Sequence, residues 1–473
     1  MSDIALPLTD RAPEAILFRR GAEAITVRRF LAEVAVLAAR LPDRPHVLNL
    51  CADRYNALLG LAAALSRGQV MLLSADRTER RQREIAALYP GLYPMADAVQ
   101  DDPAWAVPEG AIRVGGEAGA GLAVPTNPLI PAGRVAIIGF TSGSTGQPGA
   151  HPKPWGALVA ASRAAAARFG LERPAGESGA ATLVATVPAQ HMYGFETTLA
   201  LPLHAATASH AGPFFYPVEV AEALHAAPTP RLLVTTPLQM RALLRSGAAL
   251  PPLRAVISAT APLDPDLARE AEAAWSTEVL EIYGATEMGS IASRRTVEGE
   301  AWHLYDSVAL RPVEAPADAA DGAADGAADG AGGRMEALVA GMPGPVPLAD
   351  AVTLAAGGRA FRLLGRHADI VKLGGKRVSL ASLNRLLQAV PGVEDGVFLV
   401  PEDLDRNPAA RLLAFAVAPG MSGAAVLGAL RGQVDPVFLP RGVTLLPALP
   451  RDRVGKLPAA ALAALRRRQA EQA

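Results

Sequence analysis

Residues 134–148 read RVAIIGFTSGSTGQP, an apolar run followed directly by a loop of glycine, serine and threonine. The run Arg134–Phe140 has the length and composition of a buried strand. In the loop, Gly143 and Gly146 let backbone N–H groups approach a ligand closely, and the hydroxyl groups add donors without net charge. Such donors at the end of a strand form a concave set suited to phosphate oxygens. An ordinary polar loop is the alternative that composition leaves open.

The loop does not fit two common nucleotide-binding motifs. A Walker A loop has a second glycine, followed by lysine, at a fixed spacing after the first. Counting from Gly143, Pro148 stands where that second glycine belongs. No GxGxxG pattern opens a helix in the way a dinucleotide site requires. A P-loop NTPase and a Rossmann dehydrogenase are therefore both disfavoured.

Apolar runs and helical stretches alternate on both sides of this strand. Before it, the patterns predict a strand pair and a helix in residues 13–40, strands at 46–50 and 70–74, and helices near 56–67 and 79–88. After it, they predict strands at 181–187, 231–236, 254–259 and 277–283. This alternation favours an α/β fold with mostly parallel strands.

The C-terminal part of the chain has a different, compact α+β pattern. It predicts a helix at 380–389, strands at 394–400 and 412–417, a helix at 424–431 and a basic C-terminal helix. We place the domain boundary at the start of this pattern, giving domains 1–365 and 366–473. Residues 317–333 have no large apolar side chain to bury, and we expect them to form a flexible surface insertion.

Composition limits the classes of protein that need to be considered. The chain has 473 residues, with 45 Lys and Arg against 46 Asp and Glu, which argues against a basic nucleic-acid-binding protein. The single cysteine, Cys51, excludes a disulfide framework within the chain and fits a buried structural thiol. We find no signal peptide and no apolar run of ~18 residues that could span a membrane. We therefore expect a cytoplasmic protein.

The loop at 141–148 resembles the signature loop of the adenylate-forming superfamily, which includes acyl- and aryl-CoA synthetases, luciferases and peptide-synthetase adenylation domains. Further motifs of this family follow in the same order along the chain. They are HMYG at 191–194, ATAPL at 259–263, YGATE at 283–287, Asp350, GRHAD at 365–369, Lys372, GKRV at 375–378 and PRDRVGK at 450–456. The resemblance implies a large N-terminal domain of mixed sheets layered with helices and a small mobile α+β C-terminal domain.

The same resemblance implies a reaction in two halves. A carboxylate attacks the α-phosphate of ATP, which gives an acyl-adenylate and pyrophosphate. A phosphopantetheine thiol, carried by CoA or by an acyl carrier protein, then takes the acyl group and releases AMP. Because an anion must approach a polyanion, the first half needs positive charge and preorganised donors. The alternative is a degenerate member that binds a nucleotide without turnover, as a sensor or scaffold.

The matched motifs imply a role for individual residues. Glu287 would coordinate Mg²⁺, which prefers oxygen ligands, and Thr286 would bind the α-phosphate. Lys456 would bridge that phosphate and the substrate carboxylate, Lys372 is a second implied catalytic lysine, and Gly375 would line the thiol tunnel. The implied ATP-phosphate set is Thr141, Ser142, Gly143, Ser144, Thr145, Gly146 and Lys153. The implied adenine and ribose set is Ala259, Thr260, Ala261, Tyr283, Asp350 and Arg366.

The resemblance also implies an acyl pocket lined by His191, Met192, Tyr193, Gly284, Ala285 and Met288. A hydrogen-bonded core histidine is an equal alternative for His191. Amino-acid-activating relatives usually place an aspartate here to pair with the substrate amine, and the nearest acid, Glu196, does not fit that pattern. We therefore expect an acid without an α-amino group. Aromatic acids resembling hydroxybenzoate or coumarate are favoured, and a fatty acid is the alternative.

The sequence departs from the family pattern at three places. One is the hinge, where the second residue after Arg366 is usually charged and is here Ala368. The family's loop continues with Pro-Lys-Gly, but here Gly149 follows Pro148 and the next lysine is Lys153. Two prolines flank Lys153 and could hold an extended segment that points it back toward the loop. In the small domain, serine or asparagine stands at three positions where the family has glutamates: Ser379, Ser382 and Asn384. These departures bear on domain rotation and thiol transfer more than on adenylation.

Overall fold

The computed structural model describes residues 4–98, 107–116, 126–141, 149–172, 179–313, 334–366, 370–373, 376–401, 404, 410–452, 455 and 457–470. Contacts divide the chain into two compact units, Met1–Ala309 with Ala337–Val346, and Leu310–Glu336 with Pro347–Ala473. Each unit has a hydrophobic core of its own. The domain boundary predicted between residues 365 and 366 stays a prediction, and the predicted insertion at 317–333 lies outside the described residues.

The first unit contains a six-stranded sheet in the order β10-β9-β5-β4-β6-β7. Its strands are β4 (His46–Asn49), β5 (Val70–Leu73), β6 (Tyr93–Asp97), β7 (Ile112–Val114), β9 (Val135–Thr141) and β10 (Gly149–Pro154). Neighbouring strands are parallel except for β9 and β10, which are antiparallel. β9 is the strand predicted at 134–140, and it ends where the glycine- and serine-rich loop begins. β10 is an edge strand, which explains why it tolerates two prolines.

The strands of a second sheet that belong to this unit have the order β17-β16-β15-β14-β13-β11-β12-β2-β3. They are β2 (Ile16–Arg20), β3 (Glu23–Thr26), β11 (Ala181–Ala185), β12 (Thr207–His210), β13 (Arg231–Thr235), β14 (Ala255–Ser258), β15 (Glu278–Ala285), β16 (Gly289–Arg295) and β17 (Trp302–Leu304). From β2 to β15 in this order the strands are parallel, and β16 returns antiparallel to β15. The four strands predicted between residues 181 and 283 correspond to β11, β13, β14 and β15.

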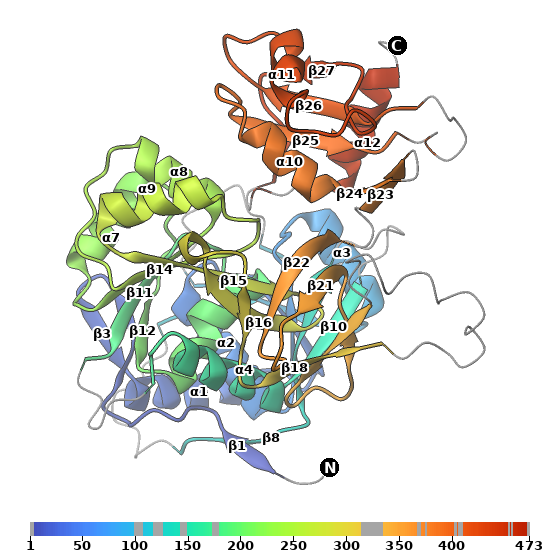
Figure 1. The fold of residues 1–473 in the computed structure, drawn as a ribbon. Coiled ribbons are helices and arrows are strands. Elements are labelled where there is room, and N and C mark those ends of the chain that lie inside the picture. The colour runs from blue at the N-terminus through green and yellow to red at the C-terminus, as the bar shows by residue number, and fades with distance from the viewer. Residues whose placement is uncertain are drawn as a thin grey trace. The chain divides into compact units, whose positions relative to one another are not determined.

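Helices cover and separate these sheets. They are α1 (Val27–Arg40), α2 (Arg54–Ser66), α3 (Glu79–Leu88), α4 (Trp155–Arg168), α5 (Met192–Phe195), a π-helical segment (Glu196–Ala200), α6 (Leu201–His204), α7 (Pro217–Ala226), α8 (Pro237–Arg245), α9 (Pro265–Trp275) and a 3-10 turn (Thr296–Glu298). α2 is buried around nearly its whole circumference, because it contacts β4 and β5 as well as the π-helical segment. α7, α8 and α9 share a core with the second sheet, and Figure 1 shows them gathered on one side of its strands.

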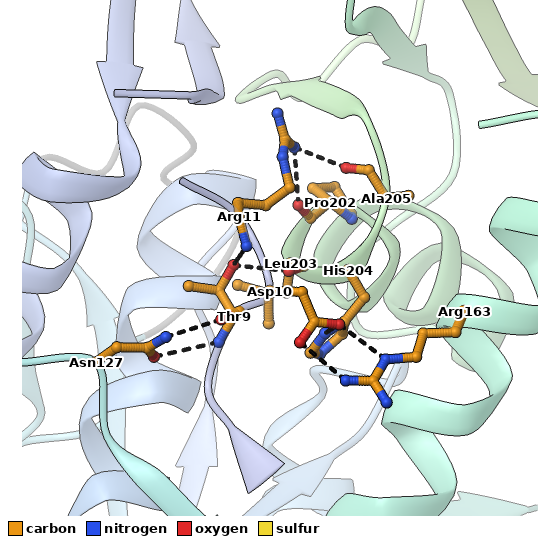
Figure 2. A network of polar contacts seen from close by, with 9 residues as sticks. All are labelled: Thr9, Asp10, Arg11, Asn127, Arg163, Pro202, Leu203, His204 and Ala205. Carbon is orange, nitrogen blue, oxygen red and sulfur yellow. Dashed lines mark hydrogen bonds and ion pairs between the residues drawn. The ribbon is translucent and has the colours of Figure 1, made fainter. Parts of the chain in front are cut away.

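The N-terminal segment is tied to α4 and α6 by polar contacts (Figure 2). The Asp10 carboxylate accepts hydrogen bonds from the Arg163 guanidinium at 2.8 and 2.9 Å and lies 3.0 Å from Nδ1 of His204. The Thr9 hydroxyl donates to the Leu203 carbonyl at 2.6 Å. Just before this segment, the short strands β1 (Ala5–Pro7) and β8 (Leu129–Pro131) pair antiparallel. The start of the chain is therefore fastened to the core of the first unit.

The second unit is built from shorter elements. β21 (Asp350–Leu354) pairs with β22 (Ala360–Arg366), and β23 (Ile370–Leu373) pairs with β24 (Lys376–Ser379), both antiparallel. A three-stranded sheet of β25 (Asp395–Leu399), β26 (Leu413–Val417) and β27 (Val443–Leu445) packs with α10 (Leu380–Gln388), α11 (Gly423–Leu430) and α12 (Ala459–Ala470). These elements agree with the α+β pattern predicted after residue 366.

The remaining strands are β18 (Val308–Pro312), β19 (Met335–Val339) and β20 (Val346–Pro347). The combination of large sheets and covering helices is the mixed α/β architecture that the sequence predicts. Among the described helices, none is both long and apolar enough to cross a membrane.

Candidate active site

The YGATE segment lies at the tip of the hairpin formed by β15 and β16. The connection 286–288 joins Ala285 to its register partner Gly289. Gly289 has a φ of 81°, the left-handed conformation that commonly closes a three-residue hairpin connection. The tip of this hairpin therefore carries Thr286 and Glu287, two of the residues that the motif singles out.

The hairpin tip meets the strand that leads into the glycine- and serine-rich loop. A Cβ added at Gly139 of β9 would lie 3.0 Å from the Thr286 side-chain methyl carbon and 3.5 Å from Cε of Met192. The absence of a side chain at Gly139 therefore lets the hairpin of the second sheet approach the first sheet closely. Three segments that the sequence assigns to one site are brought together at this point.

Glu287 presents a half-exposed carboxylate beside a histidine. Its side chain is 42% exposed, and its Oε1 lies 3.8 Å from Nε2 of His151 on β10. Burial lowers the pKa of His151, and the Glu287 carboxylate opposes this shift. No group of three or more His, Cys, Asp or Glu side chains that could hold a metal ion occurs among the described residues. A single accessible carboxylate nevertheless fits Mg²⁺, which is often bound by one or two carboxylates together with substrate phosphates.

Lys153, the lysine that follows the loop, points at the hairpin turn. It lies on β10, is 2% exposed, and its Nζ donates to the Glu287 main-chain carbonyl at 2.5 Å. Burial lowers the pKa of Lys153 to about 8, although the Glu196 and Glu287 carboxylates oppose this shift. The extended segment expected around Lys153 is observed as β10. Sequence reasoning did not assign His151 to the site, although its spacing from Lys153 places both on one face of a strand.

Glu196 is a second residue that sequence reasoning left out of the site. It begins the π-helical segment and accepts hydrogen bonds from the Ser290 N–H, at 3.1 Å, and from the Ser290 hydroxyl. Burial raises the pKa of the Glu196 carboxyl, while Ser290 and Lys153 act against this shift. A Cβ added at Gly289 would lie 2.4 Å from Glu196 Oε1, so the carboxylate packs directly on the hairpin.

The HMYG motif forms the start of α5. His191 caps this helix, and its Nδ1 accepts from the Tyr193 N–H at 3.3 Å. The Tyr193 hydroxyl donates to the Ile257 carbonyl at 2.8 Å, which ties the motif to the end of β14. A Cβ added at Gly194 would lie 2.0 Å from the Pro188 carbonyl oxygen, so this position requires glycine. The motif is thus held rigidly by the core that surrounds it.

The other residues expected in the acyl pocket belong to the hairpin. Gly284 and Ala285 are exposed, whereas Met288 is 5% exposed. A Cβ added at Gly284 would lie 2.3 Å from the carbonyl oxygen of Gly289, so the hairpin itself requires glycine at this position.

The segments expected to bind adenine lie at the carboxyl ends of the neighbouring parallel strands β14 and β15. The turn 259–263 follows β14, and its last N–H donates to the buried Glu281 carboxylate at 2.8 Å. Thr260 within this turn has a φ of 82°, a strained conformation for a residue with a side chain. The Tyr283 ring lies 5.5 Å from the Trp302 ring. Ligands of open α/β sheets commonly bind outside the carboxyl ends of the strands.

Within the second unit, Asp350 and Arg366 are direct register partners on β21 and β22. The two residues expected to bind ribose are therefore neighbours across one strand pair. Lys372 lies on β23 opposite Arg377 of β24. The side chains of Thr141, Arg366 and Lys372 are outside the described part of the structure, and so are the whole residues Ser142, Gly143, Ser144, Thr145, Gly146, Gly375 and Lys456.

Comparisons with known proteins show the family to which the chain is similar. Residues 66–316 match the family model described as AMP-binding enzyme. A 4-coumarate–CoA ligase from Rhodobacter capsulatus is 31% identical over 320 residues, which cover 67% of this chain and 73% of that protein. A 4-coumarate–CoA ligase from Halorhodospira halophila is 34% identical over 158 residues, or 33% of this chain and 36% of that protein.

Solved structures have the same fold. MatB from Rhodopseudomonas palustris with ATP bound aligns with a TM-score of 0.74 at 22% identity over 95% of both chains. The o-succinylbenzoate–CoA synthetase MenE from Bacillus subtilis, in complex with AMP, aligns with a TM-score of 0.74 at 16% identity over 96% of this chain and 97% of that one. At these identities the likeness concerns the fold, and it confirms the predicted α/β class.

Proposed function

Because the chain belongs to the AMP-binding enzyme family, we propose that it joins a carboxylic acid to a thiol in two ATP-dependent half-reactions. In the first, a carboxylate oxygen attacks the α-phosphorus of ATP and the bond to pyrophosphate breaks. In the second, a thiolate attacks the acyl carbon of the adenylate and AMP leaves. The contact between Thr286 and Gly139 supports this most strongly, since it joins the hairpin tip to the strand that leads into the phosphate-type loop.

The first half-reaction brings the substrate carboxylate to the ATP triphosphate, and both are negatively charged. The residues around them must therefore offset the negative charge of the phosphates and hold the reacting groups in position. We assign the β- and γ-phosphates to the donors of residues 141–146 and the α-phosphate to the Thr286 hydroxyl. Glu287 would hold Mg²⁺, which when bound would supply positive charge beside the phosphate oxygens. The half-exposed Glu287 carboxylate at the hairpin tip supports this assignment.

Two sets of residues are proposed for the two parts of the nucleoside. In the first unit, the turn 259–261 and Tyr283 would hold adenine, because they lie at the ends of adjacent strands. In the second unit, Asp350 and Arg366 would bind the ribose hydroxyls, which their register pairing supports.

The second unit also carries the residues proposed for bond formation and transfer. Lys456 would bridge the α-phosphate and the substrate carboxylate as a point charge on a long stem, with Lys372 as a second cation. Gly375 would let the phosphopantetheine arm pass close to the main chain.

An aromatic acid is the proposed substrate class, with a fatty acid as the alternative. Glu196 is bonded to Ser290 and packed against the hairpin, so it does not offer a carboxylate to a substrate amine. The two relatives above are named for 4-coumarate, an aromatic acid. We place the acid against His191, Met192, Tyr193, Gly284, Ala285 and Met288. CoA is the proposed thiol carrier, and an acyl carrier protein is the alternative acceptor.

ATP–pyrophosphate exchange with a panel of aromatic, fatty and amino acids tests this proposal. We expect exchange with at least one aromatic acid, and we expect Lys456→Ala to lower its rate by about 10² or more. Arg467→Ala, which removes an exposed cation from α12, is the matched control and should keep the wild-type rate.

The outcomes separate the two candidate functions. ATP binding without exchange for any acid would favour a nucleotide-binding module that does not turn over. Exchange that is equally fast in Lys456→Ala would remove this lysine from the adenylation step. Adding CoA or a phosphopantetheinylated carrier protein to the active mixture then identifies the acceptor by the release of AMP.

A further inference from the structure

Two charged side chains converge on the hairpin turn from elements that are distant in sequence. Lys153 comes from β10, and Glu196 comes from the π-helical segment. The Lys153 ammonium donates to the Glu287 carbonyl at 2.5 Å, and the Glu196 carboxylate accepts from the Ser290 N–H at 3.1 Å. The turn is therefore held on two sides by side chains of opposite charge.

Neither charge would be tolerated easily without the other. The Lys153 residue is 2% exposed. The hairpin covers one side of the Glu196 carboxylate, because a Cβ added at Gly289 would lie 2.4 Å from Glu196 Oε1. A charge held away from solvent is destabilising when the opposite charge near it is removed. The ammonium and the carboxylate each favour the charged form of the other. The arrangement is consequently sensitive to the loss of either partner.

The hydrogen bond from Lys153 leaves the functional part of Glu287 available. It reaches the main-chain carbonyl of this residue, while the carboxylate stays half exposed. Fixing the main chain at Glu287 limits the directions in which its side chain can extend. Preorganisation of this kind improves the binding of a ligand that needs the carboxylate in one place.

We propose that Lys153 and Glu196 are positioning residues that fix the turn 286–288, so that Glu287 presents its carboxylate to the Mg²⁺ that accompanies ATP. The inference rests on the proposed function. It gives Lys153 a role that acts through Glu287, without direct contact to a phosphate group. Partners that orient a metal ligand typically change metal affinity by about 10–100-fold.

Three variants separate positioning from charge compensation. Lys153→Met removes the donor to Glu287 and leaves the partly buried Glu196 without its countercharge. Glu196→Gln removes the negative charge but keeps the size of the side chain. The double variant Lys153→Met/Glu196→Gln contains no uncompensated charge and still lacks the donor. Arg163→Met, which breaks an ion pair with Asp10 away from the hairpin, is the matched control.

Metal affinity can be measured independently of turnover by titrating the protein with Mn²⁺ in the presence of ATP. The EPR signal of the free ion reports how much Mn²⁺ is unbound. We expect Lys153→Met and the double variant to weaken this affinity by about tenfold or more. The double variant should regain thermal stability that Lys153→Met loses. Binding of ATP in the presence of EDTA should stay at the wild-type value in the double variant, since it does not use Glu287. Arg163→Met should keep the wild-type Mn²⁺ affinity.

Three results would overturn the inference. If the double variant bound Mn²⁺ with wild-type affinity, Lys153 would act only as a countercharge for Glu196 and would not position Glu287. Loss of ATP binding in EDTA in that variant would make Lys153 a direct phosphate ligand. Failure of the wild-type protein to bind ATP would overturn the proposed function itself, and the inference with it.

Discussion

Asp10 has two basic partners, His204 and Arg163, in a partly buried position. Burial raises the pKa of its carboxyl, but hydrogen bonds from His204 and Arg163 outweigh this and hold the pKa well below its usual value. Burial also lowers the pKa of His204, although its hydrogen bond to Asp10 opposes this shift. A carboxyl whose pKa is lowered on folding stabilises the protein above the pH at which the unfolded chain titrates. That stability is lost as the pH falls through the lowered pKa.

Asp10→Asn is therefore expected to reduce the free energy of unfolding by about 1–3 kcal/mol at neutral pH, because a charged acceptor is lost. The difference from the wild type should shrink as the pH falls below about 4, where the carboxyl of the unfolded chain binds a proton. Urea unfolding of both proteins across this range measures the effect. A difference that stays constant with pH would show that the charge of Asp10 contributes nothing.

At the scale of single residues, motifs predict members of the candidate site, whereas contacts between distant residues cannot be predicted from them. Thr286 and Glu287 were identified from a contiguous motif, and the motif-based resemblance is confirmed by family membership. The sequence did not predict which group Lys153 contacts, because its hydrogen bond to Glu287 spans 134 positions of the chain. Glu196 carries no local signal for its bond to Ser290. The first contact depends on how two sheets meet, and the second on how the π-helical segment packs against the hairpin. No short pattern encodes either.

At the scale of elements, apolar runs predict the buried strands well, whereas turns are harder. β9 and β14 were predicted within about one or two residues, as runs of apolar side chains allow. β15 was predicted to end at Tyr283 but continues to Ala285, and β16 was not predicted. The hairpin lacks the Asn-Gly or Asp-Gly turn that usually marks such a connection. Its shape instead depends on Gly284 and Gly289.

The approach of β9 to the hairpin gives a prediction for Gly139. A Cβ here would lie 3.0 Å from Thr286, so Gly139→Val should displace the hairpin tip from the strand. Because small misplacements of reacting groups are costly, exchange should fall by about tenfold to a hundredfold. Gly133→Ala, where an added Cβ meets nothing within 4 Å, is the control. Equal exchange rates in the two variants would contradict the importance of this contact.

At the scale of the whole molecule, the order of motifs predicts the family and the overall layout of elements. The α+β pattern after residue 366 corresponds to α10, β25, β26 and α11 in the second unit. Contacts assign β21 and β22 to this unit as well, and with them Asp350. This grouping depends on contacts that no local sequence pattern encodes, and the boundary predicted between residues 365 and 366 stays a prediction.

The two separate cores predict two separable unfolding events. Leu387 is 0% exposed in the core of the second unit, and Leu233 is 0% exposed in the core of the first. Truncating either to alanine removes buried apolar contacts and should cost about 2–5 kcal/mol in the unit that contains it. Calorimetry should then show two unfolding transitions. Leu387→Ala should lower the midpoint temperature of one, and Leu233→Ala should lower that of the other. If both variants shift a single transition, the cores unfold together and the units do not act as independent domains.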